Sequence, residues 1–150
     1  MFSKAKTALA ASGILLALVG QATSESLTRE GAPVPAFKLQ YARKPASDAE
    51  FSKLWKDYLA DLPASVLVQP ASPTEIEATT VKFPEGRTLT FTMISGSATC
   101  GNQDCPERIY EDGRVIFDGR VCSNVDGHFV SADAETLTAC DRPYAIPPKR

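Results

Sequence analysis

The clearest pattern of hydrophobic and polar positions lies in residues 47–63 and predicts one amphipathic helix. Ser47 fits the N-cap of a capping box in which Glu50 reaches back, and Pro63 ends the helix. One face is charged, and the other carries apolar residues at helical spacing: Phe51, Leu54, Trp55, Tyr58, Leu59 and Leu62. Such a well-bounded apolar face favours a helix packed on a sheet over a ligand groove or a membrane-surface helix.

After Pro63 the apolar period changes to two, which predicts short strands. Residues 64–69 form a short apolar segment. Three hairpins follow, with turns at Pro84-Glu85-Gly86, at Asp112-Gly113 and at residues 132–135.

The two ends of the chain outside these elements carry weaker patterns. Residues 36–42 alternate between apolar and polar positions and predict one strand, whereas the two prolines in residues 144–150, Pro147 and Pro148, predict an irregular tail. The whole pattern predicts an α+β fold, in which one principal amphipathic helix packs on an antiparallel sheet of short strands.

The first 22 residues have the features of a signal peptide. Lys4 and Lys6 precede an uncharged, mostly apolar run at residues 7–20, and cleavage is expected after Ala22 or after Ser24. The run is shorter than the roughly 20 apolar residues of a membrane span, which disfavours an uncleaved anchor. We therefore predict a periplasmic or secreted protein with no membrane span in its mature form. A Pro- and Ala-rich segment at 23–46, partly disordered, would precede a single α+β domain at 47–150.

The charge balance excludes some classes of partner. The chain has 16 basic and 18 acidic residues, and removal of Lys4 and Lys6 leaves a net charge near −4. Nucleic acids and anionic membrane surfaces require clustered Lys and Arg, so neither is expected to bind. A cationic protein partner is compatible with this charge.

All four cysteines lie downstream of the predicted signal peptide, and an even number in an exported protein predicts two disulfides. We favour Cys100–Cys105, which is local, with Cys122–Cys140, which would join neighbouring strands. The alternative is a four-thiolate zinc site, but its usual Cys-x-x-Cys pairs are absent.

The loop between Cys100 and Cys105 is the candidate binding site. It encloses Gly101, Asn102, Gln103 and Asp104, whose side chains can form several directional hydrogen bonds. A disulfide would leave the loop little conformational entropy to lose on docking. Alternatively, the Asn and Asp side chains only satisfy backbone amides of their own loop.

The sequence contains no recognisable catalytic motif. His128 is the sole histidine and is interpreted as an ordinary strand residue, and no nucleophile elbow, phosphate loop, metal-binding pair or calcium loop occurs. We therefore expect no enzyme activity, no cofactor and no metal. A small secreted hydrolase with a dispersed site and a structural envelope protein remain as alternatives.

The order of these features resembles the Ivy-type lysozyme inhibitors, a periplasmic family of Gram-negative bacteria. The resemblance covers residues 51–108 and rests on Leu62-Pro63 with Val66, on the alternating strand, and on the Cys-x-x-x-Asp-Cys pattern of residues 100–105. It implies that the loop protrudes from an α+β sheet and plugs the active cleft of a lysozyme or another cell-wall hydrolase, and it is compatible with a homodimer. Gln103 stands where the family has a histidine, the family's Trp after Leu-Pro is missing, and Cys122 and Cys140 are additional.

Export predicts a defined mature N-terminus. Expression in a Gram-negative host should yield a periplasmic protein that begins at Thr23 or Glu25, because signal peptidase selects the small residues that precede those positions. Intact mass spectrometry of the periplasmic fraction measures this directly. Recovery of the uncleaved chain from the membrane fraction would contradict the prediction.

Overall fold

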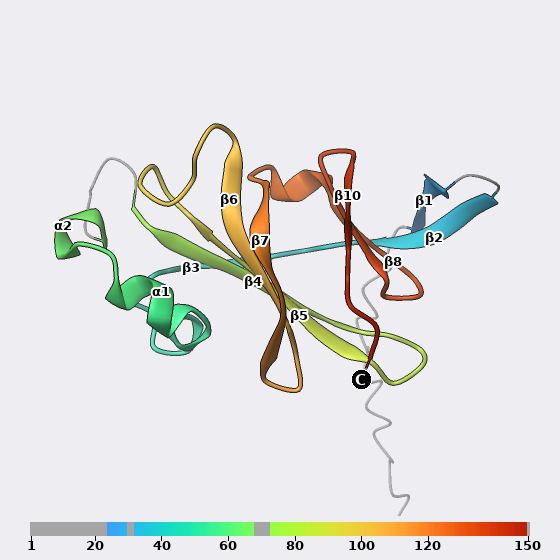
Figure 1. Cartoon of the computed structure of the whole chain (residues 1–150), viewed down its shortest axis with the longest axis horizontal. Helices are drawn as coiled ribbons and strands as arrows, with labels where there is room; N and C mark the ends of the chain where they lie inside the picture. The colour runs from blue at the N-terminus through green and yellow to red at the C-terminus, as the bar shows by residue number, and fades with distance from the viewer. Residues whose placement is uncertain (1–23, 30–31, 68–72, 150) are drawn as a thin grey trace, which may run out of the picture.

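Within the residues that the computed structural model describes, 24–29, 32–67 and 73–149, the chain forms two antiparallel sheets and a short helical segment (Figure 1). The predicted α+β class is therefore confirmed, although the strands divide between two sheets instead of forming one. The signal peptide predicted at residues 1–22 lies outside the described residues, as does part of the apolar segment 64–69.

We name the sheets by the strands that they contain. The central sheet has the order β3-β4-β5-β6-β7, with bounds β3 (Ala42–Pro45), β4 (Glu75–Lys82), β5 (Thr88–Ser95), β6 (Asp104–Glu111) and β7 (Arg114–Cys122). The terminal sheet has the order β1-β2-β8-β9-β10, with bounds β1 (Ser24–Arg29), β2 (Ala32–Lys38), β8 (His128–Ser131), β9 (Thr136–Ala139) and β10 (Arg142–Ala145).

All three predicted hairpins are present, as β4–β5, β6–β7 and β8–β9. The tightest joins Glu111 to Arg114, which pair across the turn. Asp112 and Gly113 both have positive φ, 50° and 74°, as a two-residue hairpin loop requires. Local turn chemistry therefore sets the pairing of β6 with β7 next to the turn, and the register shifts between Ile109 and Tyr110 before β6 reaches the candidate loop.

The predicted strand at 36–42 is in fact two strands in different sheets. The Leu39 N–H donates to the His128 carbonyl at 2.9 Å, after which the chain crosses to β3 in the central sheet. Phe37, Leu39 and Tyr41 all contact the core between the sheets, so the alternation continues across the crossover and hides it. As a result, residues 24–46 contribute β1, β2 and β3 to the two sheets.

Two other expectations are wrong. Residues Ala64–Leu67 form a short helix, α2, where a two-residue period was expected to begin. The tail was expected to be irregular from residue 144, but Arg142–Ala145 forms β10 because a tight turn at Cys140 and Asp141, both with positive φ, returns the chain to β9.

The main hydrophobic core lies between the two sheets. The side chains of β5 that point into it are Leu89, Phe91 and Met93, which have no exposed surface. They meet Val130 and Leu137 from the terminal sheet. The opposite face of β5 carries Thr92 and Ile94, which lie under the helical segment and are also buried.

The helical segment consists of η1 (Phe51–Trp55) and α1 (Lys56–Ala60), within the range predicted. Its cap differs from the prediction, because Asp48 and not Ser47 accepts the N–H groups of Glu50 and Phe51, each at 3.0 Å. The helix starts later than expected, so the Asp48 carboxylate, and not the Ser47 hydroxyl, is within reach of its first amides.

Trp55 anchors the helical segment to the central sheet. It has no exposed surface, packs with Ile76 and Ile94, and donates its indole N–H to Thr92 Oγ1 at 2.5 Å. The Arg108 guanidinium lies 4.7 Å from the Trp55 ring centre.

Arg108 also ties the helix to two strands through its charge. It donates two hydrogen bonds to Asp57, at 2.7 and 2.9 Å, and its Nε donates to Asp118 at 2.9 Å. The helix is thus fixed on the face of the central sheet that lies away from the terminal sheet.

Arg87 joins the two sheets at the end of β6 remote from the candidate loop. It forms a two-point ion pair with Glu111 and donates to the carbonyls of Ala134 and Pro147, at 2.9 and 2.6 Å. A buried guanidinium with this many acceptors is well satisfied, so the ends of the two sheets remain in a fixed relation.

Replacing Trp55 by Ala should lower the free energy of unfolding by about 3–5 kcal/mol, the usual cost of deleting a buried large aromatic side chain. Urea denaturation followed by far-UV circular dichroism measures this change. The exposed neighbour Lys56, changed to Ala, is the control and should cost less than about 0.5 kcal/mol. A loss below about 1 kcal/mol for Trp55→Ala would show that the helix does not anchor the sheet.

Candidate functional site

The candidate site is the connection between β5 and β6, which projects at one end of the central sheet (Figure 1). Cys100 and Cys105 form a disulfide across it, as the sequence predicts. Cys105 is fully buried in the main core, so the bond attaches the projecting loop to the rigid part of the molecule.

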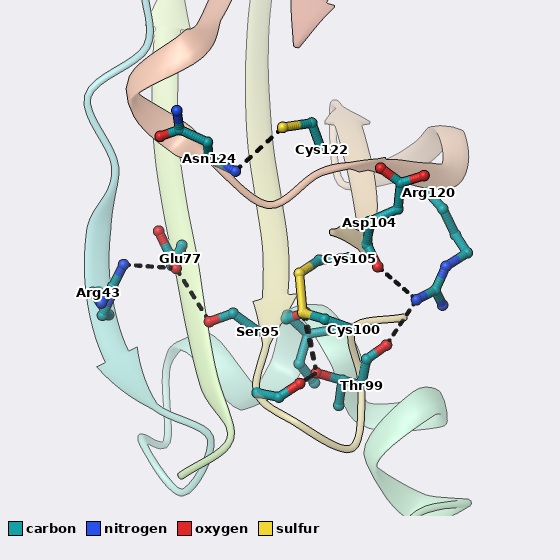
Figure 2. The surroundings of a disulfide bond; sticks show 12 residues. Arg43, Glu77, Ser95, Thr99, Cys100, Asp104, Cys105, Arg120, Cys122 and Asn124 are labelled. Carbon is teal, nitrogen blue, oxygen red and sulfur yellow. Dashed lines mark hydrogen bonds and ion pairs between the residues drawn. A yellow bond between two sulfur atoms is a disulfide. The ribbon is translucent and has the colours of Figure 1, made fainter. Parts of the chain in front are cut away.

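Arg120 of β7 closes the base of the loop. Its Nη2 donates to the carbonyls of Thr99 and Asp104, at 3.0 and 2.7 Å, and so bridges the two arms (Figure 2). Gly101 lies directly over this guanidinium, because a Cβ atom at Gly101 would lie 3.4 Å from Arg120 Nη2. The Gly101 N–H also donates to the Asp104 carbonyl at 2.9 Å.

A further hydrogen bond, from the residue that follows β7, fixes the tip. The Ser123 N–H donates to the Gln103 carbonyl at 2.7 Å. Gln103 has a φ of 70°, a left-handed conformation that costs free energy for a residue with a side chain. The hydrogen bond from Ser123 helps to hold Gln103 in this conformation, and the tip is therefore preorganised.

The predicted binding residues divide into two groups in the structure. Gly101, Asn102 and Gln103 are exposed, and within the described part of the chain the Asn102 and Gln103 side chains make no hydrogen bond. Asp104 is half-buried and accepts a hydrogen bond from Arg142 Nη2 at 2.7 Å. The carboxylate therefore helps to support the loop, and the exposed tip consists of residues 101–103.

The second predicted disulfide lies behind this loop. Cys122 at the end of β7 is bonded to Cys140 at the end of β9, so it joins the central sheet to the terminal sheet. Within the described residues no cysteine is free, which leaves no thiolates for the alternative zinc site. No group of three or more His, Cys, Asp or Glu residues in the same part of the chain could hold a metal ion.

A buried polar cluster lies between the sheets, on the core side of β6. It consists of Tyr41, Glu107 and His128, which we call the Tyr41–Glu107–His128 cluster. Tyr41 Oη lies 3.2 Å from Glu107 Oε1 and 3.1 Å from His128 Nδ1. Glu107 and His128 have no exposed surface, and Glu107 Oε2 has no hydrogen-bond partner.

Burial shifts the pKa of each of the three side chains in the cluster. Loss of hydration, helped by the nearby Glu77 carboxylate and opposed by the Tyr41 hydrogen bond, raises the pKa of Glu107 to about 8. Burial lowers the pKa of His128, and burial together with Glu107 raises the pKa of Tyr41. The cluster is therefore neutral overall at neutral pH.

A pocket of about 420 Å³ lies at the other end of β6, between the β6–β7 turn and the C-terminal tail. Glu111 and Asp112 contribute carboxylates to its lining, but the Glu111 carboxylate is paired with Arg87. Val115 beside it is exposed. The pocket is thus separated from the candidate loop by the length of β6.

Searches of protein-family models, of curated protein sequences and of solved structures found no match to this chain. No helix among the described residues is long and apolar enough to cross a membrane.

Sequence patterns identified the loop and both disulfides but not the residues that support the loop. Arg120 and Arg142 contact the loop from strands that are 16 and 38 residues away in sequence from Asp104. The Tyr41–Glu107–His128 cluster was missed for the same reason, because its members come from three separate segments. The one available signal was a polar residue two positions before an apolar one on the same face of a strand, Glu107 before Ile109 and His128 before Val130.

The buried Glu107 should make stability depend on pH. Between its unfolded pKa of 4.5 and its folded pKa of about 8, the folded protein retains a proton that the unfolded chain has lost. The free energy of unfolding therefore falls as pH rises, by at most about 1.4 kcal/mol per pH unit. Below about pH 6.5 this effect is offset, because the unfolded chain protonates His128 before the folded protein does.

The prediction is tested with Glu107→Gln, which resembles the protonated carboxyl. Urea denaturation from about pH 6.5 to about pH 8 should show a decline for the native protein that is much reduced in the variant. Asp112→Asn, at an exposed turn, is the control and should decline like the native protein. Parallel curves for the native protein and Glu107→Gln would show that Glu107 does not retain its proton.

Proposed function

We propose that this chain is an exported, non-enzymatic binding module that inserts residues 101–103 of its disulfide-fixed loop into the cleft of a protein partner. The observation that carries the proposal is a contrast within the loop. Its backbone is held by a disulfide, by Arg120 and by Ser123, whereas its tip side chains are exposed. A loop of this kind loses little conformational entropy when it docks.

The chemistry of the tip supports a partner with polar groups in a concave site. Each of the two side-chain amides, on Asn102 and Gln103, can donate and accept hydrogen bonds. Gly101 has no side chain, so a partner can approach the backbone closely at this position. The tip carries no charge of its own, since Asp104 is turned towards Arg142.

A cell-wall hydrolase, with a lysozyme as first candidate, is the partner class that we propose. The argument rests on the resemblance of residues 100–105 to the loop of Ivy-type inhibitors, and on the net negative charge of the predicted mature chain, which is compatible with a cationic partner. Two disulfides support an oxidising compartment such as the periplasm, which is where such a partner would be met.

The proposal is tested by measuring lysozyme activity with increasing amounts of the mature protein. The native protein should inhibit a c-type lysozyme weakly, and Gln103→His should strengthen inhibition because histidine can carry a positive charge to a catalytic carboxylate. Combined Asn102→Ala and Gln103→Gly should weaken inhibition about tenfold or more, since two hydrogen-bonding side chains are lost. Glycine at 103 keeps the positive φ of that position.

Two further variants distinguish the contribution of the tip side chains from that of the contacts that hold the loop. Asp112→Asn, at the opposite end of β6, should inhibit as the native protein does. Arg120→Met leaves the tip side chains intact but removes the bridge at the base, and should weaken inhibition through loop disorder. If native protein and Gln103→His both fail against c-type lysozymes and a panel of other cell-wall hydrolases, the inhibitor proposal is wrong. Turnover of a substrate by the native protein would instead favour a secreted hydrolase.

A further inference from the structure

One peptide group connects the candidate loop to the buried cluster. The N–H of the Cys122–Ser123 peptide donates to the Gln103 carbonyl at 2.7 Å. The C=O of the same peptide accepts from His128 Nε2 at 2.8 Å. Because a peptide group is planar and stiff, a change in the contact with His128 displaces the group that holds the loop tip.

The contact with Cys122 fixes the tautomer of His128. A carbonyl oxygen only accepts hydrogen bonds, so the proton of the neutral imidazole lies on Nε2 and Nδ1 is an acceptor. Tyr41 has one hydroxyl hydrogen and lies within reach of both His128 Nδ1 and Glu107 Oε1. The single hydroxyl hydrogen can serve only one of these two acceptors at a time. Both contacts are hydrogen bonds at once only if Glu107 carries a proton of its own.

A protonated Glu107 completes the hydrogen-bond chain. In this protonated form, the carboxyl would donate to Tyr41 Oη across the 3.2 Å contact, which reverses the direction that applies to a carboxylate. The Tyr41 hydroxyl would then donate to His128 Nδ1, and His128 Nε2 would donate to the Cys122 carbonyl. Transfer of this proton from Glu107 to His128 Nδ1 would leave the number of protons in the cluster unchanged, so it would not depend on pH. The cluster responds to pH only when it loses this proton to solvent.

Loss of the proton changes the contact with Cys122. An ionised Glu107, with Oε2 3.6 Å from His128 Nδ1, favours the tautomer that carries its hydrogen on Nδ1. Nε2 then has a lone pair facing the Cys122 carbonyl, so an attractive contact becomes a repulsive one. The peptide group must move, and the hydrogen bond from Ser123 to Gln103 is weakened.

The charged groups around the cluster are few. Glu77 of β4 faces Glu107, and its own charge is paired with Arg43 of β3 at 3.0 Å. In the central sheet, β5 and β7 place Met93 and Gly119 opposite Glu107, and neither residue titrates. Burial and the Glu77 charge both hold the proton on the cluster, and they set its loss near pH 8.

We propose that the Tyr41–Glu107–His128 cluster controls the order of the 100–105 loop through the Cys122–Ser123 peptide, so that loss of the cluster's proton loosens the loop tip. The coupling concerns the loop alone; its consequence, weaker binding of the partner in alkaline solution, rests on the function proposed above.

Nuclear magnetic resonance on the ¹⁵N-labelled protein tests the coupling without any partner. From about pH 6 to about pH 9, the ring nitrogens of His128 should change from the Nε2–H to the Nδ1–H tautomer with a midpoint near 8. The protection factor of the Ser123 amide should fall about tenfold with the same midpoint. Glu107→Gln should show neither change, and Glu77→Gln should lower the midpoint because it removes a neighbouring negative charge.

The control is Glu111→Gln, a buried carboxylate on the same strand that pairs with Arg87 and should leave the titration as it is. If Glu107→Gln does not fold, Tyr41→Phe breaks the chain without changing a charge and should shift the ring titration. If the His128 ring changes tautomer but the protection factor of the Ser123 amide stays constant, the proposed coupling between the cluster and the loop is wrong. A ring that keeps one tautomer up to about pH 9 would overturn the proton relay.

Binding measurements then separate this proposal from the previous one. Inhibition that falls between about pH 7 and about pH 9 in the native protein but not in Glu107→Gln would support regulation of the loop. Inhibition that is independent of pH in both would overturn that regulation while leaving the inhibitor function intact. A protein that shows the Ser123 titration but inhibits no hydrolase would keep the coupling and lose the inhibitor function.

Discussion

Glu107 lies on the core face of β6, between Cys105 and Ile109, with no exposed surface. Burial favours the protonated form of a carboxyl group in this position, and Tyr41 and the neutral His128 of the terminal sheet are the polar groups that face it. The two sheets are therefore held together at this end by a proton-dependent contact as well as by apolar packing. Arg87 and Glu111 at the other end of β6 form a buried ion pair at 2.9 Å.

The position of this contact explains why the loop is so well supported. β6 begins at Asp104, directly after the tip, so a strand fixed in the core also fixes one arm of the loop. The other arm is attached by the Cys100–Cys105 disulfide and by Arg120. These restraints come from both sheets, since Ser123 and Arg142 also reach the loop, and they place a strained Gln103 backbone at the exposed tip.

The hairpins, the helix and both disulfides could be predicted because their causes are local. A Gly after Asp at 112–113, a bounded apolar face at 51–62 and two closely spaced cysteines each act within a few residues. The division into two sheets could not be predicted, because Phe37, Leu39 and Tyr41 keep one alternation while the chain crosses between sheets. The supports of the loop depend on contacts between distant strands, which a single sequence does not display.

The 100–105 loop has a fixed backbone and is supported by a cluster that can lose a proton, and both properties affect binding. A loop that is rigid in the free protein gains affinity by avoiding an ordering cost, and any process that disorders it restores that cost. Because the His128 contact acts on a peptide group rather than on a tip side chain, it can change the population of the ordered loop without touching the partner. The disulfide limits how far the loop can open, so the expected result is a graded loss of affinity and not an unfolded site.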